Sequence, residues 1–286
     1  MFETLSRSWQ ITKLSFSVIK KDKEILLFPL LSGFFSILFI FSILFPTIFV
    51  SLLAGEEFVG SIVDYILLFL VYLGLAFIAT FFNVATVYTT KKRFEGGNAS
   101  FMESINFAFS KIHIIFMWSL VSAIVGIFLR LLENLANRMK GGGQFLVYIL
   151  RGILGVAWGI VTLFVIPVLV YKGLSPFAAI KESSLTIKKT WGESLVRHFG
   201  LGLIQFLFLL IGIVLTFLLI FFFAFLGIYF IFAVLIFGII YVLGVILIFT
   251  VANNVYNTAL YVYAQTGEIP TGFNSEVLKD AFQKQN

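Results

Sequence analysis

The segment FVIPVLVYKGLSPFAAIKESSLTIKKTWGE, residues 164–193, decides the architecture of this chain. Its first part is apolar and ends at Tyr171-Lys172-Gly173, which is typical of a transmembrane helix leaving the bilayer. A new helix is expected from Ser175-Pro176, because proline is favoured in the first helical turn. Apolar residues on one face and lysines elsewhere make this helix amphipathic: Phe177, Ile180, Ile187 and Trp191 against Lys181, Lys188 and Lys189. The segment therefore predicts a membrane span followed by a helix lying in the interface.

The composition places the whole chain among integral membrane proteins. Of its 286 residues, 60% are hydrophobic and 12% are charged, whereas soluble domains carry about 45–50% and about 25% respectively. The net charge of +6 is then explained by Lys and Arg beside anionic lipid headgroups rather than by nucleic-acid binding. Cysteine is absent, which excludes disulfides and thiolate metal sites.

Six apolar spans are expected along the chain. They form three pairs, and one amphipathic segment precedes each pair. The run from Phe199 to Tyr263 carries no charge and is too long for one crossing of a bilayer about 30 Å thick. We divide it at Leu226-Gly227. The spans are expected at about 25–53, 62–88, 112–129, 145–171, 199–226 and 228–263, and the amphipathic segments at 1–24, 100–111 and 175–192, with a fourth at 272–284.

The distribution of Lys and Arg predicts the topology. Sixteen of the 20 fall in 1–24, 91–111, 172–197 and the C-terminal segment, all on one side of a six-span arrangement. The other four are Arg130, Arg138, Lys140 and Arg151. Because positive residues are retained on the cytoplasmic side, we expect a multi-pass protein of the cell membrane with both termini in the cytoplasm.

The order of elements predicts an internal repeat. An amphipathic helix followed by two spans occurs three times, with similar starts at MFETL, SFMESI and SPFAAIKES. We therefore expect an all-α fold with a pseudo-threefold repeat of helical hairpins in a single membrane domain, 1–286. The repeats are 1–98, 99–174 and 175–270, and an amphipathic tail covers 271–286. The alternative is that six spans with short loops look threefold without being repeats.

Four stretches carry a resemblance to a known family: DKEILLFPLLSG (22–33), FFNVATVYTTKKRFEGGNASFMESINFA (81–108), residues 164–193 and NTALYVYAQTGEIPTGF (257–273). They resemble an uncharacterised prokaryotic family of six-helix membrane proteins, a domain of unknown function that is frequent in archaea. More distantly, the layout is similar to the membrane domain attached to some glycerophosphodiester phosphodiesterases. The resemblance implies a fold and a membrane location, and it implies no activity.

Four asparagines near the cytoplasmic ends of the second and sixth spans are the main polar candidates: Asn83, Asn253, Asn254 and Asn257. Polar groups in a membrane span are costly and often functional. These four could line a pore vestibule or bind a headgroup. Alternatively, they could form interhelical hydrogen bonds, worth roughly 0.6–2 kcal/mol each.

A second candidate set lies at the inner interface. Arg197-His198, together with Lys188, Lys189 and Trp191, could contact the phosphates of anionic lipids; the alternative is that they are ordinary flanking residues whose charged ends snorkel to the interface. A GxxxG motif at 155–159 could support close helix approach. A homo-oligomer is a separate option that the sequence leaves open. Arg130 and Glu133 are three apart and are expected to pair. Glu56, Glu57 and Asp64 form either a solvated loop or the rim of an oligomeric pore.

The sequence contains no catalytic constellation. Its two histidines, His113 and His198, are isolated, and HExxH, nucleophile-elbow and P-loop motifs are absent. We therefore expect no metal, no cofactor and no enzyme activity. The sequence favours a passive channel or facilitator for a small or lipidic substrate. Two alternatives remain: a membrane organiser that acts through the amphipathic helices, and a lipid-modifying enzyme.

Overall fold

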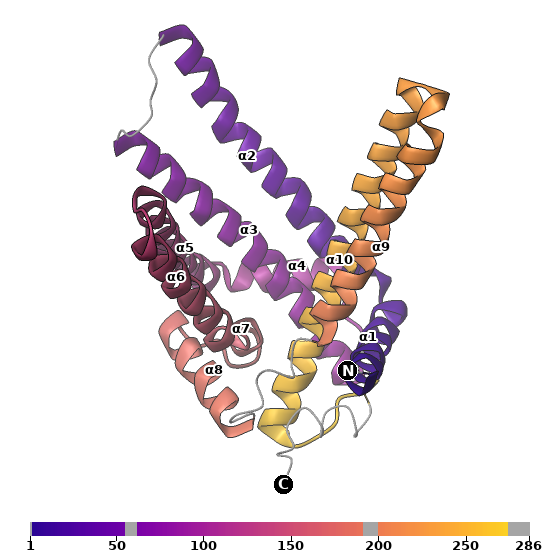
Figure 1. The fold of residues 1–286 in the computed structure, drawn as a ribbon. Helices are drawn as coiled ribbons and strands as arrows, with labels where there is room; N and C mark the ends of the chain where they lie inside the picture. The colour runs from indigo at the N-terminus through magenta and orange to yellow at the C-terminus, as the bar shows by residue number, and fades with distance from the viewer. Residues whose placement is uncertain (1, 55–61, 191–199, 274–286) are drawn as a thin grey trace. The chain divides into compact units, whose positions relative to one another are not determined.

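The computed structural model describes residues 2–54, 62–190 and 200–273, and every regular element there is a helix (Figure 1). In chain order the elements are α1 (Phe2–Lys21), η1 (Lys23–Leu26), α2 (Leu27–Ala54), α3 (Ile62–Phe94), α4 (Phe101–Ser110), α5 (Ile112–Arg138), α6 (Gly142–Val161), α7 (Val165–Lys172), α8 (Pro176–Thr190), α9 (Gly200–Phe223), η3 (Ala224–Leu226) and α10 (Ile228–Thr266).

The expected all-α polytopic fold is confirmed. Six helical segments among the described residues are long and apolar enough to cross a membrane: α2, α3, α5, α6 with α7, α9 and α10. The uncharged run divides where predicted, because α9 and η3 end at Leu226 and α10 begins after Gly227. Gly227 has φ +96°, a backbone conformation that glycine adopts without steric cost. This glycine therefore turns the chain back without any polar residue.

Three helices continue past the ends of the predicted spans. α3 runs through Lys91, Lys92 and Arg93 to Phe94, and α5 reaches Arg138. α10 has 39 residues, which is about 58 Å of helix against a hydrocarbon layer of about 30 Å. A basic residue marks where a helix leaves the bilayer, but the helix itself ends only where its backbone is capped or turned. α3, for example, ends just before Gly96, whose φ is +82°.

The fourth span is interrupted, which the sequence analysis did not predict. α6 ends at Val161 and α7 begins at Val165, two residues before Pro167. Proline removes one helical hydrogen bond and clashes with the preceding turn, so a break on its N-terminal side is expected. At the break, the backbone N–H of Phe164 donates to Oγ of Ser183 on α8 at 3.1 Å, and both residues are fully buried. The Ser183 hydroxyl thus accepts a hydrogen bond from the Phe164 N–H at the point where the helix is interrupted.

Substituting Ser183 by alanine is expected to destabilise the protein by about 1–3 kcal/mol, because the buried Phe164 N–H loses its acceptor. Thermal unfolding in detergent measures the effect. Ser184→Ala is the matched control, since the Ser184 hydroxyl donates only to Ile180 O of its own helix. Equal unfolding temperatures for the two variants would contradict this role of Ser183.

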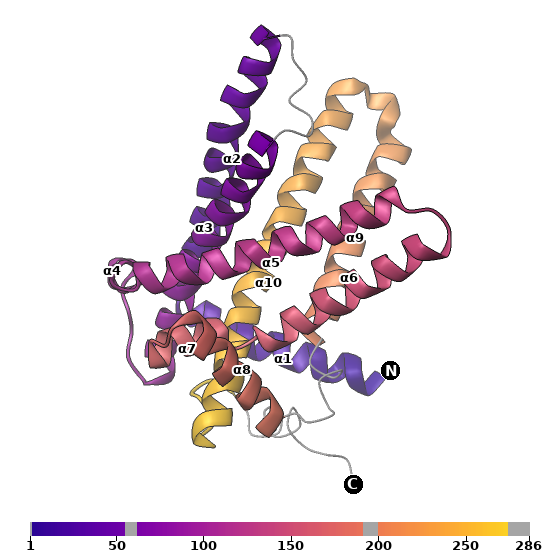
Figure 2. The ribbon, with the colours of Figure 1, turned by 90° about the vertical axis from the view of Figure 1, so that its left-hand side faces the viewer.

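The chain forms two compact units, and α3 contributes to both. The first unit comprises residues 1–27, 90–98 and 189–286. Here α1 packs on α9 and α10, and Phe16 meets Phe249 edge-on with 5.6 Å between ring centroids. α9 and α10 form a hairpin in which the Tyr241 ring lies against Gly212 and Tyr241 OH donates to Phe208 O at 2.9 Å. Both views show these two helices side by side (Figure 2).

The second unit comprises residues 28–89 and 99–188. Its α5 and α6 pack as an antiparallel hairpin, with Trp118 and Trp158 stacked at 5.8 Å (Figure 2). α8 is joined to the end of α7 by an ion pair between Lys172 and Glu182. The turn between these helices is as predicted: Gly173 has φ +62° and Pro176 is the first residue of α8.

The helices α1, α4 and α8, which fall in the predicted amphipathic segments, share one feature of burial. Each has a completely buried serine: Ser15 in α1, Ser104 in α4 and Ser183 in α8. Small hydroxyl side chains allow helices to approach closely and can hydrogen-bond across the contact. This common feature is consistent with three repeats, although the boundaries 1–98, 99–174 and 175–270 remain a prediction.

Candidate apolar binding site

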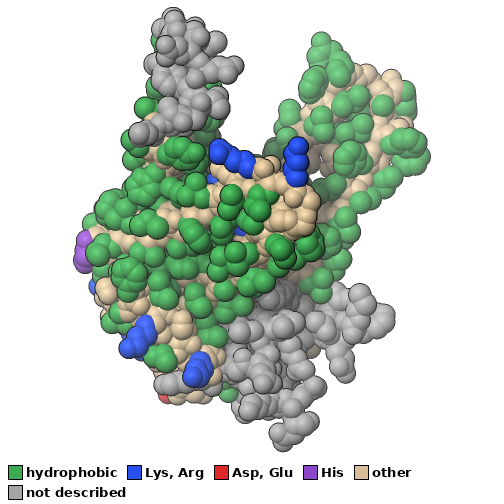
Figure 3. Space-filling view, turned by 60° about the vertical axis from the view of Figure 1, so that its left-hand side comes forward, with side chains coloured by type: hydrophobic (Ala, Val, Ile, Leu, Met, Phe, Trp, Pro, Cys, Tyr) green, Lys and Arg blue, Asp and Glu red, His purple; other side chains and the backbone are tan. Residues whose placement is uncertain are grey.

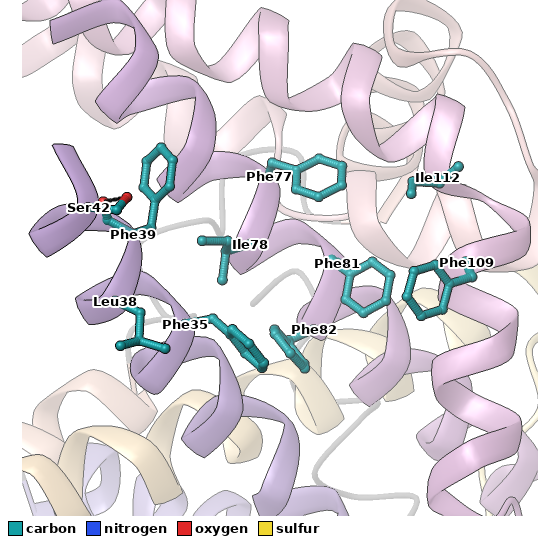
Figure 4. Close-up of a pocket in the computed structure, with 10 residues that line it drawn as sticks. All are labelled: Phe35, Leu38, Phe39, Ser42, Phe77, Ile78, Phe81, Phe82, Phe109 and Ile112. Carbon is teal, nitrogen blue, oxygen red and sulfur yellow. Dashed lines mark hydrogen bonds between the residues drawn. The ribbon is translucent and has the colours of Figure 1, made fainter. Parts of the chain in front are cut away.

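A cavity of about 510 Å³ lies among α2, α3 and the corner where α4 meets α5 (Figure 4). All of its lining residues belong to the second unit. The lining residues are Phe35, Leu38, Phe39 and Ser42 of α2, Phe77, Ile78, Phe81 and Phe82 of α3, Phe109 of α4 and Ile112 of α5.

Helical spacing brings these side chains to one surface. The four residues of α2 are spaced i, i+3, i+4 and i+7, which is a single helix face. Those of α3 form two pairs four residues apart, Phe77 with Phe81 and Ile78 with Phe82. The cavity is therefore a groove between two facing helix surfaces, and the α4–α5 corner closes one end.

The walls are held by aromatic contacts. Phe81 meets Phe82 edge-on at 5.3 Å and Phe109 edge-on at 4.9 Å. Phe35 stacks on Phe82 with 6.0 Å between centroids. Figure 4 shows these rings facing one another from α2, α3 and α4. Such pairs contribute about 0.5–1.5 kcal/mol each beyond burial, so α2, α3 and α4 hold the cavity in shape together.

The cavity has a buried floor and an exposed rim. Phe81 and Phe82 are each 8% exposed, whereas Phe35, Leu38, Phe109 and Ile112 are between 42% and 56% exposed. The groove is thus open to its surroundings on one side. α2 and α3 are long and apolar enough to cross a membrane, and in a bilayer the open side of the groove would face lipid chains.

The lining is almost wholly apolar. Six of the ten residues are phenylalanine, and in the described part of the chain Ser42 supplies the one polar lining side chain. Its hydroxyl donates to Phe39 O of the same helix at 2.7 Å. The groove therefore offers no charge or free amide to a polar ligand, and it fits a flexible hydrocarbon chain.

The α2–α3 wall depends on Gly74. A Cβ at this position would lie 2.1 Å from the Phe39 ring, so Phe39 packs directly on the α3 backbone. Gly74→Ala is expected to push this ring aside and to lower stability by about 1–3 kcal/mol. The matched control is Gly33→Ala on α2, where nothing lies within 4 Å of the added methyl. Thermal unfolding in detergent compares the two; equal temperatures would contradict the close packing.

Hydrogen bonds fix α4 against the end of α3 and so position Phe109 and Ile112. Tyr88 OH donates to Glu103 at 2.7 Å, and the Tyr88 ring stacks on Phe107 at 4.1 Å. Thr89 and the buried Ser104 share a hydrogen bond of 2.7 Å between their hydroxyls. α4 begins at Ser100, whose side chain accepts from the Glu103 backbone N–H, a typical N-cap.

Comparison with known families gives a match. A sequence model described as a family of unknown function (DUF6159) matches residues 62–273, about three quarters of the chain. The chain belongs to this family. No curated protein and no solved structure matches it. The family match includes α3 and the α4–α5 corner of the cavity and begins after α2. The archaeal association and the distant similarity to glycerophosphodiester phosphodiesterases remain predictions.

In this family member the four asparagines do not line the cavity. Asn83 is half-buried on α3 in the second unit. Asn253, Asn254 and Asn257 are half-buried on α10 in the first unit, in the part of α10 that continues beyond one bilayer thickness from Ile228. The structure describes each group within its own unit, so a shared role as a pore vestibule or an interhelical contact remains a prediction.

The interfacial candidates are only partly described. Lys188 is exposed near the end of α8, and Lys189 is in the same helix. Trp191, Arg197 and His198 lie outside the described residues, as do Glu56 and Glu57. The glycines of the GxxxG motif, Gly155 and Gly159, have open space where a Cβ would stand. No group of three or more potential metal-ligating side chains occurs among the residues the structure describes.

Proposed function

We propose that this family member is a non-enzymatic facilitator for a lipidic substrate, and that an acyl chain occupies the cavity between α2 and α3. The observation that supports the proposal is the apolar groove itself, with its buried phenylalanine floor and its open rim. A lipid chain can enter such a groove sideways from the bilayer without crossing a polar barrier.

The same lining argues against an ion pathway through this cavity. An ion that loses its hydration shell needs carbonyls, charges or amides in return, and the one lining hydroxyl is engaged with Phe39 O. A lipid chain gains little hydrophobic free energy on leaving the bilayer for a protein groove, because both are apolar. Binding is therefore expected to be weak and exchange rapid, which suits transfer better than storage.

A membrane organiser is the second candidate, and exposed residues on α1 and α8 favour it. Phe177 on α8 is 73% exposed, and Lys181 and Lys188 on the same helix are exposed as well. On α1, Trp9 is 43% exposed and Lys13 Nζ lies 5.4 Å from its ring. An exposed aromatic side chain beside lysines is suited to the membrane interface.

Reconstitution tests the leading proposal. Liposomes containing the purified protein are loaded with a fluorescent phospholipid and an ion-sensitive dye, and scrambling and ion flux are recorded in one preparation against protein-free liposomes. The expected result is phospholipid movement above the control without ion flux. Folded protein that moves neither species would overturn the facilitator proposal, and ion flux without lipid movement would replace it with a channel.

A further inference from the structure

A cluster of three charged side chains joins the two helices of the α5–α6 hairpin. Nη1 of Arg130 lies 3.2 Å from Oε2 of Glu133, which confirms the pair expected from the sequence. Nη2 of Arg151, on the facing helix, lies 3.4 Å from the same oxygen. One carboxylate oxygen therefore holds guanidinium groups from both helices close together.

The cluster has one more positive than negative charge, and its donors are accessible. The side chains of Arg130 and Arg151 are 47% and 46% exposed, and that of Glu133 is 28% exposed. Each guanidinium has five N–H donors in a fixed planar arrangement, of which a single shared carboxylate oxygen can engage few. The remaining guanidinium N–H groups can therefore donate to a second acceptor that has several oxygens.

The surface around the cluster is apolar in both directions along the hairpin. Phe128 and Leu131 beside Arg130 are 51% and 46% exposed, and Leu150 and Ile153 beside Arg151 are 48% and 60% exposed. α5 also continues eight residues beyond Arg130 to Arg138, about 12 Å further. The cluster is therefore on the flank of a membrane helix and not at its tip. On the face shown in Figure 3, Lys and Arg side chains are likewise few and stand among hydrophobic ones.

We propose that Arg130 and Arg151 bind a phosphate group, with Glu133 as the positioning residue that sets their spacing. Two guanidiniums present paired donors that match phosphate oxygens. The chemistry is shared by a phospholipid headgroup and free phosphate, and the apolar surroundings favour the lipid. The site is independent of the cavity, because Arg130 is 18 residues along α5 from Ile112, about 27 Å away.

The test measures retention of phosphatidylglycerol by the purified full-length protein in an uncharged detergent, using native mass spectrometry. Diacylglycerol with the same chains lacks the phosphate and is the control lipid. The variant Arg130→Gln/Glu133→Gln/Arg151→Gln is expected to bind phosphatidylglycerol about tenfold or more weakly, with unchanged binding of diacylglycerol. Making all three residues neutral avoids leaving Glu133 without a partner.

Arg138→Gln is the matched control, because Arg138 is exposed at the end of α5 and outside the cluster; it is expected to bind like the wild type. Should the triple variant not fold, as judged by circular dichroism, Arg130→Lys/Arg151→Lys carries the test. It keeps the charge, loses the paired donors and is expected to bind weakly.

Displacement of the lipid by millimolar inorganic phosphate identifies a site for the free anion, and resistance to it identifies a lipid site. Wild-type binding by a folded variant overturns the proposal.

Discussion

Phospholipid transfer by the Ser42→Trp variant is expected to fall about tenfold or more in liposomes, with the protein still folded. Ser42 is an exposed residue of α2 that lines the cavity beside Phe39, so an indole can enter the groove from the rim without disturbing the buried floor. The loss of about ten atomic contacts with a bound chain, at 0.1–0.2 kcal/mol each, weakens binding by about 1–2 kcal/mol. That corresponds to about tenfold in affinity.

Ile37→Trp is the matched control for this experiment. Ile37 is on the same helix, 56% exposed, and outside the cavity lining, so the same bulky ring is added to a lipid-facing surface. Transfer by this variant is expected to equal that of the wild type. If Ser42→Trp and Ile37→Trp transfer lipid equally well, the cavity is not the route of the substrate.

Most of the architecture could be predicted from the sequence, because each span is a long apolar run that ends at charged residues or at a glycine. Lys91, Lys92 and Arg93 indicate where the second span leaves the bilayer, and Gly227 divides the last run. Helix ends were less predictable, since α3 and α5 continue past those charges. The break before Pro167 was also missed, although proline disfavours the helical backbone on its N-terminal side. The hydrogen bond from the Phe164 N–H to Ser183 at this break could not be predicted, because Ser183 belongs to another helix.

The candidate site could not be predicted from the sequence. Phenylalanine occurs 37 times, and in a helix that is apolar on every side the spacing of Phe77 and Phe81 indicates no particular face. The Arg130–Glu133 pair was predictable because residues three apart on a helix are neighbours. The contribution of Arg151 was not, because it depends on how α5 and α6 are aligned in the hairpin.

Arg93→Ala is expected to destabilise the protein by about 3 kcal/mol or more, the largest stability effect that we predict. Nη2 of Arg93 lies 3.1 Å from Oδ2 of Asp22, and the Asp22 side chain is 6% exposed, so the pair joins the end of α3 to the end of α1 within the first unit. The same Nη2 atom also donates to Asn98 Oδ1 at 2.7 Å. Removing one partner of a buried pair leaves the other charge desolvated, which costs more than the pair contributes. Unfolding by denaturant in detergent measures the loss.

Two further variants test whether the loss of stability comes from the buried Asp22 carboxylate or from side-chain truncation in general. Glu95→Ala breaks a pair with Lys91 whose atoms are 3.9 Å apart and in which the Glu95 side chain is 52% exposed, so it is expected to cost less than about 0.5 kcal/mol. Asp22→Asn/Arg93→Ala removes the stranded carboxylate charge, and it is expected to be more stable than Arg93→Ala alone. Were the double variant less stable than the single one, the buried charge could not be the source of the destabilisation, and the loss would instead reflect the packing of the Arg93 stem.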